Sequence, residues 1–108
     1  MMIEKMPRPH WELLPRPGAV GVTYRVMLKR AGIAIANLRF SPNATIDEHS
    51  APYEIDVLCI AGEGFVSVGE QSSPFQAGQR IVRPPGINHR LWTENAEMET
   101  LMVERNGV

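Results

Sequence analysis

The sequence predicts an all-β fold, and two observations carry that prediction. The chain has 108 residues, including nine glycines and nine prolines, so chain breakers are too closely spaced for long helices. Between the breakers lie short apolar runs, and residues 22–29 alternate best between apolar and polar side chains. A period of two is typical of a half-buried strand. Seven or more such strands indicate a β-sandwich or β-barrel.

The expected strands follow one another along the chain, with turn-forming residues between them. They cover residues 22–29, 33–40, 55–61, 65–68, 80–83, 89–93 and 99–103. The separators are rich in Gly, Pro and Asn, which favour turns; they include Ser41-Pro42-Asn43, Gly62-Glu63-Gly64 and Pro84-Pro85-Gly86.

The first 18 residues have a different composition. Four prolines fall within residues 7–17, and proline cannot donate to a sheet ladder. We therefore expect a Pro-rich N-terminal arm or edge strand over residues 1–18, with Trp11 and Leu13 as its docking points. Residues 19–108 are expected to form one β-barrel domain.

The composition also excludes several classes of protein. A formal net charge of −1 provides no general attraction to nucleic acid or to an anionic membrane. No apolar run approaches the roughly 20 residues of a membrane span, and the N-terminus lacks the apolar stretch of a signal peptide. The single cysteine, Cys59, is expected to be a core thiol in a reducing compartment. We expect a cytoplasmic protein whose partner is a small molecule.

Two segments carry the candidate functional side chains. The second segment has Gly78, five residues, Pro84-Pro85-Gly86, two residues and then His89. This spacing resembles the second motif of the cupin superfamily.

The first segment resembles the first cupin motif, with two departures. Asp47 stands where the first histidine belongs, and His49 stands at the second. Glu54 follows at the spacing of the motif glutamate, but seven residues instead of six separate it from Gly62. Because side chains of a strand alternate between faces, the offset leaves open whether Glu54 or Ile55 points inward.

The resemblance implies a jelly roll, a double-stranded β-helix barrel of two antiparallel sheets with a ligand site inside. It further implies that His49 and His89, with Asp47 or Glu54, hold a divalent transition metal, for which Fe, Mn, Ni and Zn are all candidates. Asp47 and His49 are two residues apart, so in a regular strand both would point to one face. Asp47 could instead form a local Asx turn. Residues expected to contact a substrate are Tyr53, Arg39 and Trp92.

Three functions remain open on these residues. The first is a metal-dependent enzyme of the dioxygenase, isomerase or decarboxylase type, acting on a small organic acid, sugar or aromatic compound. The second is a non-catalytic or sensor cupin that binds a small ligand with a degenerate or empty metal site. The third is a β-sandwich interaction module without a site. Since single-domain cupins commonly cover their sheet edges by pairing, the resemblance also implies a homodimer.

Overall fold

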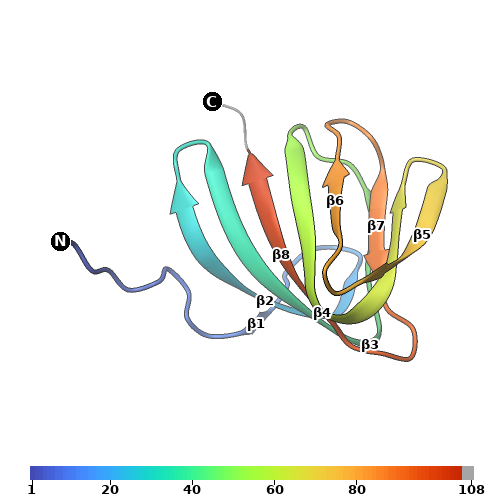
Figure 1. Cartoon of the computed structure of the whole chain (residues 1–108), viewed down its shortest axis with the longest axis horizontal. Coiled ribbons are helices and arrows are strands. Elements are labelled where there is room, and N and C mark those ends of the chain that lie inside the picture. Colours follow the sequence, from blue (N-terminus) through green and yellow to red (C-terminus); the bar gives the residue numbers. More distant parts are fainter. Residues whose placement is uncertain (106–108) are drawn as a thin grey trace.

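The computed structural model describes residues 1–105, which form a barrel of eight antiparallel strands (Figure 1). The strands are β1 (Glu12–Leu13), β2 (Ala19–Arg30), β3 (Ile33–His49), β4 (Glu54–Val68), β5 (Gln71–Gln76), β6 (Arg80–Arg83), β7 (His89–Trp92) and β8 (Met98–Arg105). The prediction of an all-β fold is therefore confirmed. None of these residues forms a helix of the length and apolarity that a membrane crossing requires.

The two longest strands, β3 and β4, each belong to two sheets. Most of β3 pairs with β2 and β8, whereas its last residues, 45–49, pair with β7. Residues 54–62 of β4 pair with β8 and β6, and residues 63–68 pair with β5 and β7. One layer is therefore β2–β3–β8–β4–β6 and the other is β3–β7–β4–β5. Bending of the two shared strands closes the barrel, which confirms the two-sheet prediction.

The corners of these strands lie at residues that were expected to be turns between strands. Asn43 has a φ of 57° and Gly62 a φ of 72°, in the left-handed region that Asn and Gly tolerate best. A Cβ atom on Gly62 would lie 2.0 Å from the backbone oxygen of Glu97, so the close approach of this segment requires glycine. The expectation of loops here was wrong, because the residues bend strands that continue on both sides.

The strand β5 was not predicted. Its sequence is mostly polar, and Phe75 is its one buried residue, at 3% exposure. It lies at a sheet edge beside β4, where Pro74 is tolerated because an edge strand does not need every ladder donor. Pairing with β4 therefore stabilises β5 as a strand, although its sequence lacks the usual alternation of apolar and polar residues.

The pairing register arranges the interior side chains in layers. The layer at the end of the barrel where β6 and β8 finish consists of Ala34, Glu104, Ile55 and Arg83, from β3, β8, β4 and β6. The buried apolar core includes Val22, Leu38, Phe40, Ala44, Ile46, Val57, Cys59, Val66, Phe75, Leu91, Met98 and Met102. The end layer thus differs from the apolar core, because it places charged groups at the barrel interior.

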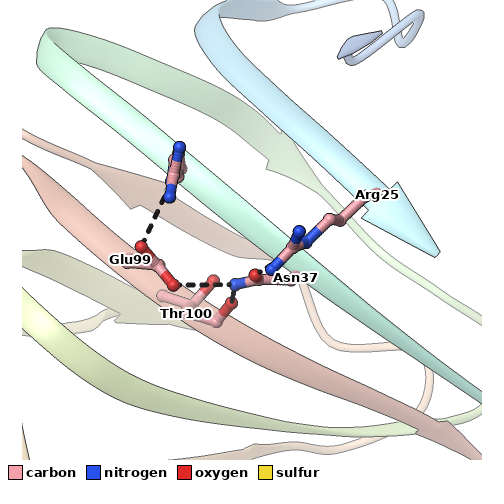
Figure 2. Close-up of polar contacts among 5 residues, drawn as sticks. Arg25, Asn37, Glu99 and Thr100 are labelled. Carbon is pink, nitrogen blue, oxygen red and sulfur yellow. Dashed lines mark hydrogen bonds and ion pairs between the residues drawn. The ribbon is translucent and has the colours of Figure 1, made fainter. Parts of the chain in front are cut away.

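A buried amide joins three strands on the outer side of the barrel. Figure 2 shows Asn37 of β3, which donates from Nδ2 to the backbone oxygen of Thr100 at 3.0 Å and to Oε2 of Glu99 at 3.3 Å. Nε of Arg25 on β2 donates to Oδ1 of Asn37 at 3.3 Å. These bonds satisfy an amide that is only 3% exposed, as a buried polar group requires.

The N-terminal segment docks against the same outer surface. In Figure 1 its first residues extend away from the barrel. The Trp11 ring lies 4.6 Å from the guanidinium of Arg25 and 4.0 Å from that of Arg39, distances typical of cation–π contacts. Leu13 is 76% exposed, and it is Leu14 that packs on the core. Leu13 is therefore not a docking point.

Candidate functional site

The centre of the candidate site is a pair of imidazoles on neighbouring strands. His49 of β3 lies directly opposite His89 of β7 in the pairing register. Their Nε2 atoms are 3.0 Å apart, and the ring planes meet at 77°. His89 is only 1% exposed, because it alternates with Arg90 and shares the inward face of β7 with Leu91. The structure thus brings together the two histidines that the motifs singled out.

A β-bulge in β3 aims His49 into the barrel. Ile46 lies opposite Leu91 and His49 opposite His89, so three steps along β3 match two along β7. Ile46 and His49 consequently both face the interior. Asp47 is exposed, and its N–H donates to the backbone oxygen of Gly18 at 3.0 Å. The expectation that Asp47 and His49 share a face was wrong, because it assumed a regular strand.

The glutamate of the first motif is also turned away from the imidazoles. Glu54 and Asp56 share the outer face of β4, and Arg105 pairs with both, at 3.8 Å and 3.1 Å. Ile55 takes the inward position and is 4% exposed. Across residues 1–105, no three His, Cys, Asp or Glu side chains gather closely enough to hold a metal.

His49 of the imidazole pair lines a cavity of about 310 Å³ inside the barrel. Most of its wall is apolar and comes from β2, β3, β4 and β8. His49, Arg83 and Glu104 contribute polar groups from the barrel, and exposed Arg16 and Lys29 lie at the cavity mouth. Arg16 belongs to the N-terminal segment, so this segment completes the cavity.

The hydrogen bonds around His49 define where its ring carries hydrogen. Nδ1 lies 2.8 Å from the backbone oxygen of Asp47; a carbonyl only accepts, so Nδ1 is the donor. Nε2 of neutral His49 is then an acceptor, and Nη1 of Arg16 donates to it at 2.7 Å. The Nε2–H of His89 donates to the same atom. The lone pair of His49 therefore already accepts two hydrogen bonds.

Both imidazoles are neutral at pH 7. Burial, together with the nearby charge of Arg83, lowers the pKa of His89 to about 3. Burial also lowers the pKa of His49, although its bond to the Asp47 backbone acts in the opposite direction. Nδ1 of His89 is buried without a partner of normal hydrogen-bond geometry, which agrees with a neutral ring whose hydrogen is on Nε2.

These residues do not fit the metal centre that the cupin resemblance implies. Two nitrogens each about 2.1 Å from one metal and about 90° apart would lie about 3.0 Å from each other, so the spacing alone is compatible. The chemistry of the donor set is not, because no carboxylate of residues 1–105 joins the pair and Arg16 occupies the His49 lone pair. Arg83 adds a second cation to the same cavity. A centre of two histidines and a carboxylate is therefore not formed here.

The three residues expected to contact a substrate lie at different places. Arg39 is on the outer face, where it pairs with Glu99 at 3.2 Å. Trp92 faces away from the cavity and stacks on Phe65, with ring centroids 5.6 Å apart. Tyr53 is next to the cavity wall, because its hydroxyl donates to Oε2 of Glu104 at 3.4 Å. The structure therefore brings only Tyr53 near the imidazole cavity.

Two functional candidates, Arg83 and Arg16, were not expected from the sequence. Arg83 could have been found from strand alternation, since residues 80–83 place it on the same face as Ile81, inside the barrel. Its neighbour Val82 is 36% exposed and Arg83 only 2%, the reverse of what polarity favours. No signal in the sequence indicated that Arg16 reaches His49, because that contact spans 33 residues.

Comparisons with known proteins identify the fold. No protein-family model and no curated protein matches the chain. Among solved structures, the polyketide cyclase RemF from Streptomyces resistomycificus is similar at a TM-score of 0.84 and 20% identity, over 95% of this chain and 79% of that one. A predicted oxalate decarboxylase from Thermotoga maritima has a TM-score of 0.83 at 19% identity, over 96% of this chain and 98% of that one.

A third similar structure carries the name of the fold. A cupin-2 domain protein from Rhodospirillum rubrum aligns with a TM-score of 0.81 at 14% identity, over 98% of this chain and 76% of that one. The barrel is therefore a cupin fold, as the two motifs predicted.

Proposed function

We propose that this cupin-fold chain binds one small organic molecule in the cavity beside His49 and His89, without a resident metal. The observation that carries the proposal is the cavity itself, with its apolar wall and a few inward polar groups. Its volume of about 310 Å³ is at the lower end of the range for small-molecule pockets, about 300–1,000 Å³. This is the second of the three functions that the sequence left open.

The metal-dependent enzyme is less well supported by the same site. A metal bound to both histidines would have to displace Arg16 from Nε2 of His49. It would also have to enter a cavity that already contains the guanidinium of Arg83. Two of the similar structures bear enzyme names, a polyketide cyclase and a predicted oxalate decarboxylase, but a shared fold does not transfer a reaction.

Filling the cavity tests the proposal. Ala36 of β3 lines the cavity, and Ala31 is exposed in the turn between β2 and β3. We expect wild-type protein to bind 2-naphthol, an uncharged fluorescent aromatic compound, with one site in a fluorescence titration. Ala36→Phe should abolish binding because its ring occupies the cavity, and Ala31→Phe should leave binding unchanged.

Two outcomes would contradict the proposal. One is that 2-naphthol, and equally a smaller probe such as phenol, fails to bind the wild-type protein. The other is that binding persists unchanged in Ala36→Phe. If Ala36→Phe loses the native near-ultraviolet circular dichroism spectrum, Ala34→Leu replaces it, because Ala34 lines the same cavity nearer its mouth.

A further inference from the structure

Arg83 is a buried cation whose donors lack partners. It is 2% exposed, and its Nε and Nη2 atoms have no hydrogen-bond partner among residues 1–105. These two N–H groups lie along one edge of the guanidinium, and a carboxylate can accept from both at once. A buried charge without a partner is unfavourable. The arrangement therefore points to a partner supplied by a ligand.

Among residues 1–105, no carboxylate lies within ion-pair distance of this guanidinium. The ion pairs among residues 1–105 use Arg39 and Arg105. Glu104 lines the same cavity but is outside ion-pair distance of Arg83, and its Oε2 accepts from Tyr53. Burial lowers the pKa of Arg83 to about 9, and Glu104 only partly opposes this, so the group is still cationic at pH 7.

The charges around the cavity favour an anion. Arg16, Lys29 and Arg83 line it with three cationic groups, against the single carboxylate of Glu104. The two histidines are neutral and do not change this balance. The charge of Arg16 is close enough to disfavour the charged form of Arg83. An anion placed between them would relieve this repulsion.

The remaining residues of the cavity wall are mostly apolar, so they favour an anion that carries a hydrocarbon group. Leu38, Ile46 and Met102 face the cavity, and each is less than 7% exposed. A ligand that fills this space therefore gains by burying hydrocarbon, while its anionic end lies toward the charged layer.

We propose that the ligand is a small organic acid with an apolar body, whose carboxylate pairs with the guanidinium of Arg83 at the cavity wall. Because Nε and Nη2 are themselves buried, the guanidinium has to turn toward the cavity before both can donate to the carboxylate. Arg16 lies at the mouth, on the other side of the carboxylate. This inference rests on the proposed function, because it requires that the cavity take up a small molecule.

A pair of isosteric probes separates the two proposals. We expect 1-naphthoate to bind the wild-type protein at least tenfold more tightly than 1-naphthamide in calorimetric titrations at pH 7. Arg83→Met should bring the two affinities within twofold of each other. Arg83→Lys, which keeps the charge but lacks the paired donors, should keep part of the difference. Arg80→Met is the matched control, because Arg80 is on the same strand and exposed, and it should keep the full difference.

The possible results of these titrations show which of the two proposals is wrong. If naphthamide binds wild-type protein as tightly as naphthoate, the cavity binds small molecules but the carboxylate inference is wrong. If neither binds, and neither benzoate nor benzamide binds, both proposals are wrong. If the preference for naphthoate persists undiminished in Arg83→Met, the anion is recognised elsewhere and the assignment to Arg83 is wrong.

Discussion

At the scale of single residues, Arg16 determines what the imidazole pair can do. Its guanidinium donates to the one lone pair of His49 that faces the cavity. A cation competing for that lone pair must break a charge-assisted hydrogen bond and approach two guanidiniums. The hydrogen bonds already made by the pair therefore oppose metal binding at His49.

Removing Arg16 should consequently favour metal binding. We expect Arg16→Ala to bind Zn²⁺ about tenfold or more tightly than wild type, because a hydrogen bond to a charged group contributes about 1.5–3 kcal/mol. Calorimetric titration of tag-free protein measures this. Arg8→Ala is the control, since Arg8 lies on the same segment and bonds to Tyr24 instead of His49. Equal Zn²⁺ affinity in wild type and Arg16→Ala would show that Arg16 does not block the pair.

The sequence could predict part of this site. The motif spacing singled out His49 and His89, and the structure places them opposite each other. Asp47 and Glu54 could not be placed, because a single extra residue in a strand reverses the face of a side chain. Arg83 was not expected inside the barrel, because arginine side chains are rarely buried without a partner. Metal ligation by the two histidines stays a prediction from the resemblance alone.

At the scale of elements, the barrel depends on corners within β3 and β4. The corner at Gly62 brings β4 against the start of β8, where Gly62 lies opposite Met98. Its positive φ and the nearby Glu97 backbone leave no room for a side chain. The strand boundaries in this region could not be predicted, because Gly and Asn favour an interruption and a corner equally, and only pairing with neighbouring strands distinguishes the two.

Two glycine substitutions distinguish the free-energy cost of a Cβ contact with the Glu97 backbone from the cost of a positive φ alone. Gly62 and Gly78 both have a positive φ, but a Cβ atom on Gly78 would meet nothing within 4 Å. We expect Gly78→Ala to lower the free energy of unfolding by about 1–2 kcal/mol, the left-handed penalty alone. Gly62→Ala should lower it by about 3–5 kcal/mol, because the β4–β8 approach must also open. Urea unfolding measures both, and equal losses would contradict the account of the corner.

At the scale of the whole molecule, the barrel maintains a charged layer beside an apolar core. The layer contains Arg83 and Glu104, and the N-terminal segment adds Arg16 at the mouth. A group kept for binding commonly reduces the stability of the free protein. Arg83 would be such a group under the proposal, because its buried donors find no partner within residues 1–105. Assembly into a homodimer stays a prediction.

Thermal unfolding of wild type and Arg83→Met, each with and without 1-naphthoate, tests the central claim most directly. Without ligand, Arg83→Met should melt several degrees higher, because losing an unsatisfied buried group is worth about 1–3 kcal/mol. With naphthoate at a hundred times its wild-type Kd, wild type should gain about 2.7 kcal/mol, whereas a variant that binds tenfold more weakly should gain about 1.4 kcal/mol. A ligand-free variant that melts well below wild type, with naphthoate stabilising both proteins equally, would show that Arg83 serves the fold and not an anionic ligand.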